Sequence, residues 1–391
     1  MSKAHADWLD RPYVRKIVSS LGSDNIRFVG GAVRDWLAGR VVRDIDAATP
    51  LAPEVVQERL EAHGIKAVPT GIEHGTITAV CDGDTVEITT LRMDMETDGR
   101  RATVTFTDNW KTDAARRDFT FNALYLSPEG KLHDPFDGQA DLKAGRVRFI
   151  GDAETRIEED ALRIMRFFRF HAWYGKGEPD REGMSACRQK VALLKALSAE
   201  RVRSELLKLF AAPEPNESIT AFERIGATAV LRLGPLNSVR LSRYIAREQM
   251  FDFEIDALMR LACWLVLKQD EVAAFARQFR LSTKDRVRLE AMTGGWVAGV
   301  PGTAAELRSF IYRAGRNAAQ VCVLAAEDDP PDELVRLLKS WEKPVFPLKG
   351  GDLIDHGLEP GPEVSRRLVA LEDLWVKSDF SLSRADLLEK V

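Results

Sequence analysis

The sequence predicts a mixed α/β region up to about residue 150, followed by an all-helical remainder. Short strand-like runs alternate with helix-like runs as far as Ile150, whereas turn residues become sparse after Gly151 and apolar residues then recur with helical periodicity. The 391-residue chain is long enough for two or more domains, and its apolar and charged fractions are those of an ordinary soluble protein. The expected fold is an α/β head with a mixed sheet, followed by an elongated helical neck, body and tail.

Several segments of the head have the apolar patterns of short strands, and others have those of helices. The expected strands are Ile26–Val29, Val42–Ala47, Gly75–Cys81, Thr85–Arg92 and Ala123–Leu126. The expected helices are Val33–Leu37 and Pro53–His63. In the helical remainder, changes of composition predict joints between bundles at Ala211–Ser218, Thr293–Thr303 and Glu327–Glu333.

The composition excludes several classes of protein. With 56 Lys and Arg against 60 Asp and Glu the net charge is -4, so any basic surface for a nucleic acid must be local. The four cysteines are scattered without a CxxC pair, which is typical of reduced core cysteines in a cytosolic protein. The N-terminal stretch MSKAHADWLD does not resemble a signal or transit peptide, and no apolar run approaches the roughly 20 residues of a membrane-spanning helix. We therefore expect a soluble, cytoplasmic protein with no membrane association.

A glycine pair and an aspartate pair occur close together early in the chain. Gly30 and Gly31 follow an expected strand and precede a helix, an arrangement that lets backbone N–H groups approach an anion such as phosphate. Asp44 and Asp46 should project from one face of the next strand while Ile45 points into the core. Two such carboxylates repel each other unless a cation lies between them, and Mg²⁺ prefers oxygen ligands. Two solvated aspartates have the same pattern, so a metal site is one of two interpretations.

A third carboxylate, Glu87, lies between Val86 and Ile88 on another expected strand. An acidic side chain on an otherwise apolar strand is costly to bury without a partner. Beside the aspartate pair, Glu87 would complete a two-metal site in which one ion activates an attacking hydroxyl and the other stabilises the leaving oxygen. The alternative is that Glu87 faces solvent, and the residues alone leave both interpretations open.

Two adjacent arginines begin the stretch RRDFTFNAL. The planar guanidinium groups of Arg116 and Arg117 are suited to phosphate, and the carboxylate of Asp118 can accept a hydrogen bond from a ribose hydroxyl. The simpler interpretation is a salt bridge at the cap of a helix. A phosphate or nucleotide site is thus a hypothesis that other motifs must support.

These motifs resemble those of a known enzyme superfamily. The order GG, RD and DxD, with this spacing, is similar to that of nucleotidyltransferases such as DNA polymerase beta. The stretch VGGAVRDWLAGRVVRDIDAAT is more similar to the class II tRNA nucleotidyltransferases, which are the CCA-adding enzymes and the related bacterial poly(A) polymerases. The resemblance is firm from about Ile26 to Phe210. It implies that the glycine pair and Arg34 lie against the triphosphate and that Asp44 and Asp46 hold two Mg²⁺ ions.

The stretch RRDFTFNAL matches the RRDFTxNA motif of this family. The match implies that Arg116, Arg117, Asp118 and Asn122 bind the sugar and phosphates and favour ribonucleotides. Upstream, in the segment that begins at Thr90, the polar core MDMETDGRR predicts a loop that carries Arg92, Arg100 and Arg101. It is similar to the flexible loop that helps CCA-adding enzymes switch from C to A addition, and it has no obvious deletion, which argues against an enzyme that adds only C.

The stretch RIEEDALRIMRFFRF has a helical pattern that would place Asp160, Arg163 and either Arg166 or Phe167 on one face. An aspartate acceptor beside an arginine donor matches the edges of cytosine and adenine, but uracil and guanine present a carbonyl and an N–H there instead. The competing interpretation is an i,i+3 salt bridge, worth about 0.2–0.5 kcal/mol. Similarity to the family motif EDxxRxxRxxRF implies that Asp160 and Arg163 select CTP and ATP without a nucleic-acid template. It also implies that Glu159 orients Arg163 and that Arg166 and Arg169 face nucleotide phosphate or the RNA end.

The C-terminal stretch FPLKGGDLIDHGLEPGPEVSRRLVALEDLW has two glycine-bearing turns, each before an expected helix. Such helix starts can hold backbone phosphates, here near Lys349, Arg366 and Arg367, although plain interhelical turns have the same pattern. A weaker resemblance in this part implies contacts with tRNA. The expected domains are the nucleotidyltransferase head (1–150), a helical neck with base recognition (151–215), a helical body (216–340) and a tail that contacts tRNA (341–391).

The resemblance implies Mg²⁺-assisted attack of the tRNA 3'-hydroxyl on the α-phosphate of CTP or ATP, with release of pyrophosphate. One alternative is a poly(A) polymerase, which the missing basic tail and the CCA-type loop disfavour. Others are an enzyme that adds only C or only A, and a non-catalytic RNA-binding descendant, which should have lost DxD or EDxxR. An HD phosphohydrolase site at His133 and Asp134 is rejected because the sequence has only six histidines and no second HD dipeptide.

Overall fold

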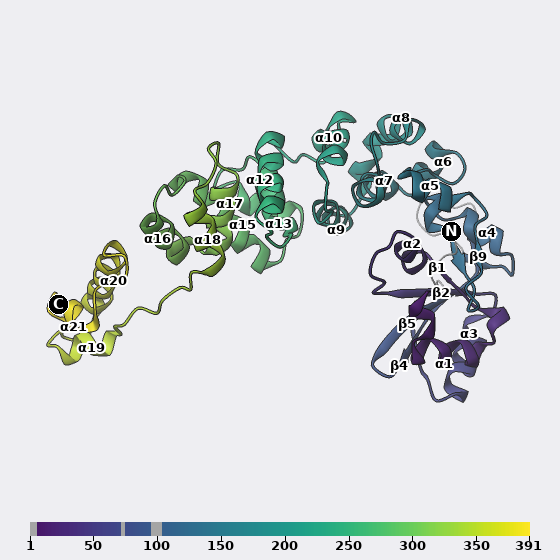
Figure 1. The fold of residues 1–391 in the computed structure, drawn as a ribbon, viewed down its shortest axis with the longest axis horizontal. Helices are drawn as coiled ribbons and strands as arrows, with labels where there is room; N and C mark the ends of the chain where they lie inside the picture. The colour runs from purple at the N-terminus through teal and green to yellow at the C-terminus, as the bar shows by residue number, and fades with distance from the viewer. Residues whose placement is uncertain (1–5, 72–74, 95–103) are drawn as a thin grey trace. The chain divides into compact units, whose positions relative to one another are not determined.

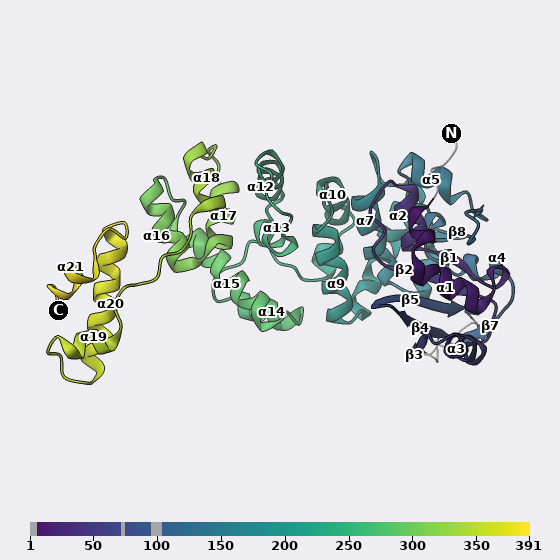
Figure 2. The same ribbon diagram turned by 60° about the horizontal axis from the view of Figure 1, so that its bottom comes forward.

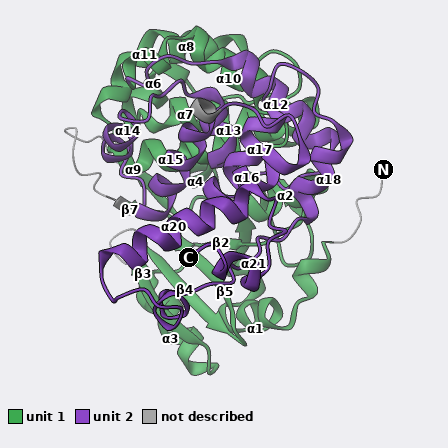
Figure 3. Cartoon of the chain, turned by 90° about the vertical axis from the view of Figure 1, so that its left-hand side faces the viewer, with its two compact units in different colours: residues 1–231 green, residues 232–391 purple. Residues whose placement is uncertain are grey.

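The computed structural model describes residues 6–71, 75–94 and 104–391. The chain forms two compact units, residues 1–231 and residues 232–391, which Figure 3 shows in different colours. Within the described residues, the strands all lie before residue 134, and beyond residue 150 the chain forms helices and their connections (Figure 1). The predicted fold class, a mixed α/β head followed by helices, is confirmed. The predicted division into head, neck, body and tail stays a prediction.

The strands of the head, within the described residues, are β1 (Arg27–Val29), β2 (Ile45–Thr49), β3 (Lys66–Gly71), β4 (Thr76–Cys81), β5 (Asp84–Thr90), β6 (Arg92–Asp94), β7 (Val104–Phe106), β8 (Tyr125–Leu126) and β9 (Leu132–His133). Most of them form one sheet in the order β3-β4-β5-β2-β1-β8-β9, and β6 pairs with β7 separately. Adjacent strands of the large sheet are antiparallel except for β2 and β5, which run parallel, so the sheet is mixed as predicted.

The helices of the head are α1 (Pro12–Leu21), α2 (Gly31–Leu37), α3 (Pro53–Ala62), α4 (Trp110–Ala115) and α5 (Gly138–Ala144). α1 and α3 each have a proline at the first helical position, where the missing N–H has no intrahelical partner to lose. α3 packs on β3 and β4 and against α1 (Figure 2), and α2 packs on β1 and β2. The α2 contact holds the turn after β1 beside the first residues of β2.

One strand boundary changes the interpretation of the aspartate pair. β2 begins at Ile45 rather than at Val42, because its pairing with β5 starts at Ile45 and its pairing with β1 starts at Asp46. The prediction that Asp44 lies on the strand beside Asp46 is therefore wrong, since Asp44 lies in the exposed bend before β2. The strand β3 was not predicted at all, because its side chains are mostly exposed and it contains Pro69.

The remaining helices of the first unit are α6 (Ala153–Glu159), α7 (Leu162–Tyr174), α8 (Arg181–Lys190), α9 (Ala199–Phe210), α10 (Asn216–Arg224) and α11 (Ala227–Val230). α7 packs against α9 and α10. Aromatic rings join α7 to the head: Phe167 stacks on Phe149 at 5.7 Å, and Phe170 meets Phe119 edge to face at 5.4 Å. Because Phe119 follows the RRD motif directly, this cluster fixes the motif against α7.

The second unit contains α12 (Ser238–Met250), α13 (Ala257–Trp264), α14 (Val272–Gln278), α15 (Thr283–Ala298), α16 (Ala304–Ala314), α17 (Arg316–Leu324), α18 (Asp332–Ser340), α19 (Gly350–Asp355), α20 (Pro362–Lys377) and α21 (Arg384–Leu388). α12, α13, α15, α16 and α17 pack on one another. The cysteines are free and buried, as expected, at Cys81, Cys187, Cys263 and Cys322. In the part of the chain that the structure describes, no helix is long and apolar enough to span a membrane.

Candidate active site

A tight turn between β1 and α2 brings the backbone close to Asp46. Gly30 has a φ of +70°, a backbone conformation that residues other than glycine rarely adopt. A Cβ atom at Gly30 would lie 3.8 Å from Nη1 of Arg117 and 4.0 Å from Oδ2 of Asp46. Gly31 follows as the first residue of α2. The glycine pair therefore lies between a carboxylate and an arginine that were both predicted as site residues.

Asp46 and Glu87 are register partners on the parallel strands β2 and β5. Their side chains therefore project from the same face of the sheet, with Asp46 half-buried and Glu87 exposed. Burial, and then the charge of Glu87, raise the pKa of Asp46 to about 6, and the charge of Asp44 contributes in the same direction. The structure thus places Glu87 beside Asp46, and a cation would relieve the repulsion between these two carboxylates.

A chain of hydrogen bonds joins α2 to the neck helix α7. Nη1 of Arg34 donates to Oδ1 of Asn122 at 2.7 Å, and Nδ2 of Asn122 donates to Oδ1 of Asp118 at 2.8 Å. Arg166 on α7 completes the chain by binding Oδ2 of Asp118 at 2.6 Å. Burial alone would raise the pKa of Asp118, but the charge of Arg166 and the hydrogen bond from Asn122 outweigh it and lower that pKa. The buried aspartate therefore stays ionised and holds two predicted site residues in place.

The arginine pair of the RRD motif follows the end of α4. Both Arg116 and Arg117 form an ion pair with Asp113, so the predicted alternative of a local helix salt bridge is present. Their main chain is also held from the neck, because the buried Arg156 on α6 donates to the carbonyl oxygens of both arginines, at 2.9 Å for Arg117. Arg163 adds a longer contact of 3.4 Å to the carbonyl oxygen of Arg116. The salt bridges do not withdraw these arginines from the cavity described below.

Asp160 lies between two helices rather than on one. α6 ends at Glu159, Asp160 is extended at φ −152° and ψ 104°, and α7 begins at Leu162. The prediction of one helical face shared by Asp160, Arg163 and Arg166 is therefore wrong for Asp160. The physical reason is that its carboxylate accepts a hydrogen bond from the N–H of Leu162 at 3.0 Å, as capping aspartates do.

The ion pairs around this break differ from the expected i,i+3 pair. Arg163 binds Glu159 at 2.5 Å, which is the contact implied by the family motif. Asp160 instead binds Arg201 on α9 at 2.7 Å. Nothing in the sequence pointed to this contact between Asp160 and Arg201. Arg169 binds the buried Glu205 at 2.8 Å, and burial lowers the pKa of Arg169 to about 10.

One cavity of about 480 Å³ in the first unit collects most of these side chains. The predicted site residues that line it are Gly30, Gly31, Arg34, Asp46, Arg116, Arg117, Asp118, Asn122, Asp160, Arg163 and Arg166. The predicted site residues outside its lining are Asp44, Glu87, Glu159 and Arg169. Lining residues not predicted as site residues are Arg92, Leu162, Phe170 and Arg201. Phe170 belongs to the aromatic cluster that joins α7 to Phe119. In the sequence, only its position in the run RFFRF could have indicated a place in the site.

The cavity is strongly positive although the chain has a net charge of -4. Seven arginines and three aspartates line it, which suits a polyanion such as a nucleoside triphosphate. Arg34 is held at the cavity wall by the ring of Tyr174, at 4.6 Å from its centroid, and by Asp35 at 3.0 Å. The predicted loop carries Arg92, which lines the cavity, together with Arg100 and Arg101, which lie outside the described residues.

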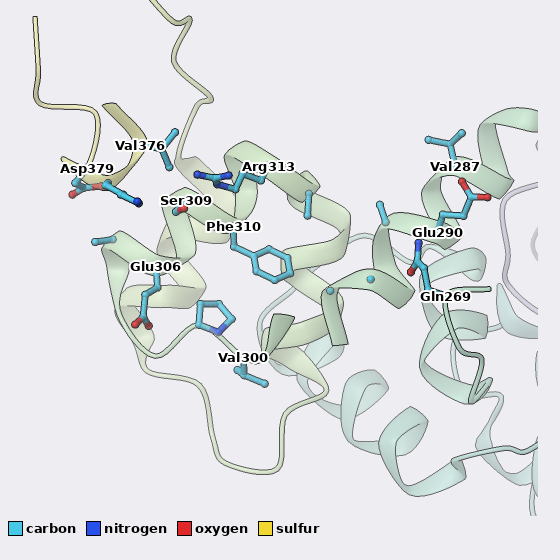
Figure 4. Close-up of a pocket in the computed structure, with 18 residues that line it drawn as sticks. Gln269, Val287, Glu290, Val300, Glu306, Ser309, Phe310, Arg313, Val376 and Asp379 are labelled. Carbon is cyan, nitrogen blue, oxygen red and sulfur yellow. The ribbon is translucent and has the colours of Figure 1, made fainter. Parts of the chain in front are cut away.

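A larger cavity of about 1030 Å³ lies in the second unit, between α15, α16 and the end of α20 (Figure 4). Its lining mixes apolar side chains such as Val287 and Phe310 with charges of both signs, including Glu290 and Arg313. It has neither the concentration of arginines nor a sequence motif. The smaller cavity of the first unit is therefore the candidate active site.

Known proteins share these features over most of the chain. Residues 26–148 match the Poly A polymerase head domain family, and residues 178–231 match the family described as "Probable RNA and SrmB- binding site of polymerase A". CCA tRNA nucleotidyltransferase 1, mitochondrial, of Mus musculus is 33% identical over 384 residues, covering 94% of this chain and 86% of that protein. The CCA-adding enzyme of Lactobacillus johnsonii is 40% identical over 378 residues, covering 93% of this chain and 92% of that protein.

This chain belongs to the CCA-adding enzyme family. The family implied by the sequence motifs is therefore confirmed. Among solved structures, the Bacillus stearothermophilus CCA-adding enzyme in complex with CTP is 27% identical, with a TM-score of 0.74, and the match covers 97% of this chain and 98% of that one. The second matched segment, 178–231, contains Arg201, the partner of Asp160.

Proposed function

We propose that this chain adds C, C and A to the 3' end of tRNA from CTP and ATP, without a nucleic-acid template and with release of pyrophosphate. The observation that carries the proposal is the single cavity in which Asp46, the arginines of the RRD motif and Asp160 of the EDxxR motif meet. The names of the relatives describe CCA addition and tRNA, and one solved relative binds CTP.

The nucleotide would lie with its phosphates against the arginines of the head. Gly30 and Gly31 leave room for close approach of the phosphates to the backbone, and Arg34, Arg116 and Arg117 supply the opposing charge. The ribose would lie near Asp118 and Asn122. Oδ2 of Asp118 already binds Arg166, so a ribose hydroxyl would share that oxygen with the guanidinium group.

The base would be selected by Asp160 and Arg163. Cytosine and adenine both offer an amino donor for the carboxylate and a ring-nitrogen acceptor for the guanidinium, which supports a choice made by protein side chains alone. Both selecting groups are oriented by neighbours, since Arg201 binds Asp160 and Glu159 binds Arg163. Preorganised donors and acceptors of this kind discriminate because a wrong base leaves them unpaired.

Two Mg²⁺ ions would be held by Asp44 and Asp46, with Glu87 as a further acid. The donor set fits, because burial and then the charges of Glu87 and Asp44 raise the pKa of Asp46, and a bound cation would offset those charges. When bound, the metal supplies activation of the attacking 3'-hydroxyl and neutralisation of charge on the pyrophosphate. Among the described residues no three His, Cys, Asp or Glu side chains form a metal-binding cluster by themselves, so substrate phosphate oxygens are expected to complete the coordination.

The tRNA would extend from this cavity, and the tail stays the expected site of further tRNA contacts. There, Arg366 pairs with Glu363 at 2.8 Å, and Arg367 donates to the carbonyl oxygen of Val391 at 3.0 Å. Both arginines therefore have partners within this end of the chain, and Lys349, which is exposed, stays a candidate for phosphate contact. The cytoplasm is the expected location, and cell fractionation tests it.

Incubation of the purified chain with CTP, ATP, Mg²⁺ and a tRNA lacking its 3' end tests the proposed function, with sequencing of the products. The expected product is a tRNA ending in CCA with no further addition. An open-ended run of A without C would support the poly(A) polymerase. Addition of C alone or A alone would identify a partial enzyme, and binding of tRNA without addition would identify a non-catalytic relative.

A further inference from the structure

A single buried carboxylate lies behind the arginines of the candidate active site. Asp113 is on α4, is 1% exposed and does not line the cavity. Its Oδ1 accepts hydrogen bonds from Nε of Arg116 at 2.9 Å and from the backbone N–H of Arg92 at 3.2 Å. Its Oδ2 accepts from Nη2 of Arg117 at 3.2 Å and from the hydroxyl of Tyr125 at 2.7 Å. Three residues of the cavity lining, Arg92, Arg116 and Arg117, thus meet on one carboxylate that lies outside the lining.

The helix explains this arrangement. Arg116 and Arg117 follow Asp113 by three and four residues, the two spacings at which side chains of a helix face each other. Burial alone would raise the pKa of Asp113, but the charges of Arg117 and Arg116 outweigh it and lower that pKa. The carboxylate is therefore ionised and can direct two long, flexible side chains at once.

The main chain of the two arginines has separate support. Arg156 donates to the carbonyl oxygens of Arg116 and Arg117 from α6, and this contact does not involve Asp113. Loss of the Asp113 charge would therefore leave the backbone of the motif in place and release only the guanidinium groups. If Asp113 only stabilised the fold, its loss would disturb the backbone of the motif and the guanidinium groups together.

We propose that Asp113 is a positioning residue for nucleotide binding, which holds Arg116 and Arg117 in the direction in which they meet the phosphates and ribose. The proposal rests on the proposed function, because it takes the cavity as the nucleotide site. The same carboxylate accepts a hydrogen bond from the backbone N–H of Arg92, so it also connects the first residue of β6 to the arginine pair. Preorganisation of this kind lowers the ordering cost when the triphosphate binds.

The first unit offers a matched control. Asp141 is also a fully buried carboxylate that binds two arginines, Arg146 at 2.5 Å and Arg148 at 2.8 Å. Neither of these arginines lines the cavity. The variants Asp113→Asn and Asp141→Asn therefore each remove one charge from a buried carboxylate. Asp141 also accepts a hydrogen bond from the hydroxyl of Thr120 at 2.7 Å, but none of these side-chain partners of Asp141 lines the cavity, whereas both arginine partners of Asp113 do.

The test measures KM and kcat for CTP and for ATP, the KM for tRNA and the thermal unfolding temperature of both variants. Asp113→Asn is expected to raise the KM for both nucleotides about tenfold or more, since misplacement of a binding group by about 1 Å can cost about 100-fold. The KM for tRNA should stay within about twofold, and Asp141→Asn should lower the unfolding temperature without changing the KM for either nucleotide. Equal nucleotide KM values in the two variants would overturn the proposal.

Two further measurements keep the result decisive. If Asp113→Asn does not fold, Tyr125→Phe removes one hydrogen bond from the carboxylate and one from Nε of Arg117 and keeps both ion pairs, and it should raise the nucleotide KM about two- to threefold. An unchanged KM would then overturn the proposal.

Equilibrium binding of CTP without tRNA separates this proposal from the proposed function. A wild-type chain that adds no nucleotide would refute the function, whereas the ratio of CTP Kd values between variant and wild type would still test Asp113.

Discussion

Asp46 of β2 and Glu87 of β5 face each other across parallel strands, and the charge of Glu87 contributes to the raised pKa of Asp46. The sequence left open whether Glu87 faces solvent or joins the aspartate pair. In the structure its side chain is exposed and its residue is the register partner of Asp46, so a role of Glu87 as a third acid stays a prediction. An exposed carboxylate beside a half-buried one is accessible to a metal-bound substrate, which supports a role as a third acid.

Substitution of these carboxylates should separate chemistry from RNA binding. Asp46→Asn is expected to reduce single-turnover addition to tRNA about 1000-fold or more, because charge on the transferring phosphoryl group would lose its stabilisation. Asp44→Ala should have a similar effect, and Glu87→Gln a smaller one of about 10- to 100-fold. Binding of tRNA by each variant should stay close to that of the wild type in a filter-binding assay.

The exposed Asp84 at the start of β5 provides the control, since Asp84→Asn removes a charge from the same strand. Near-normal turnover in Asp46→Asn would remove the two-metal mechanism. A Glu87→Gln variant as active as Asp84→Asn would mean that Glu87 is only a solvated strand residue.

The base-selecting role of Asp160 can be tested by competition among nucleotides. Asp160→Ala removes the acceptor that fits the amino groups of cytosine and adenine, so incorporation of UTP and GTP should rise relative to CTP and ATP by about tenfold or more. Arg201→Met removes the partner of Asp160 without removing the carboxylate, and it should weaken selectivity less. Unchanged selectivity in Asp160→Ala would show that the residue only caps α7.

Local motifs made most of this site predictable, and contacts between distant segments made the rest unpredictable. Gly30, the RRD motif and Asp160 each stand in short patterns whose chemistry can be read residue by residue. Arg201 is 41 residues from Asp160, and only the packing of α9 against α7 brings the two together. The break before α7 was not predicted, because the apolar periodicity is continuous across it. The break depends on a single side chain, the carboxylate of Asp160, which accepts a hydrogen bond from the N–H of Leu162.

The same distinction applies to the fold. The alternating pattern located β1, β4 and β5 to within a few residues, because each buries one or both faces. It did not locate α1, whose first residues follow an acidic, polar N-terminal stretch, or α4, which is only six residues long. Asp113 was not predicted as a site residue because it lies on the short helix α4, although it precedes the RRD motif by only three residues.

The ion pair between Asp118 and Arg166 should make stability depend on pH in a defined direction. Because the folded pKa of Asp118 is lowered, its contribution to stability is fully present above the unfolded value of about 3.9 and is lost as the pH falls through the folded pKa. Arg166→Met leaves the buried carboxylate without its partner and raises its pKa. We expect a loss of about 2 kcal/mol in the free energy of unfolding at pH 7, less than the roughly 3–5 kcal/mol of fully buried pairs.

Urea unfolding of Arg166→Met and the wild type at pH 7 and pH 4 checks this expectation. The difference between them should shrink at pH 4, since Asp118 then becomes protonated in the folded variant. The exposed pair of Arg15 and Asp10 is the control, and Arg15→Met should change the free energy of unfolding by about 1 kcal/mol or less at either pH. An equal loss at both pH values would show that Arg166 stabilises through packing rather than through charge.

The second unit contains a salt bridge whose removal should affect stability and leave nucleotide binding unchanged. Arg260 on α13 and Glu248 on α12 are 0% and 1% exposed, and Nε of Arg260 donates to Oε2 of Glu248 at 2.9 Å. Arg260→Leu leaves a buried carboxylate uncompensated and should cost about 3–5 kcal/mol in the free energy of unfolding, whereas the double variant Glu248→Leu with Arg260→Leu should recover most of that loss. Urea unfolding measures both, and the Kd for CTP should match the wild type because the nucleotide cavity is lined by residues of the first unit. A double variant no more stable than Arg260→Leu would mean that the pair specifies the packing of α12 on α13 beyond its charge balance.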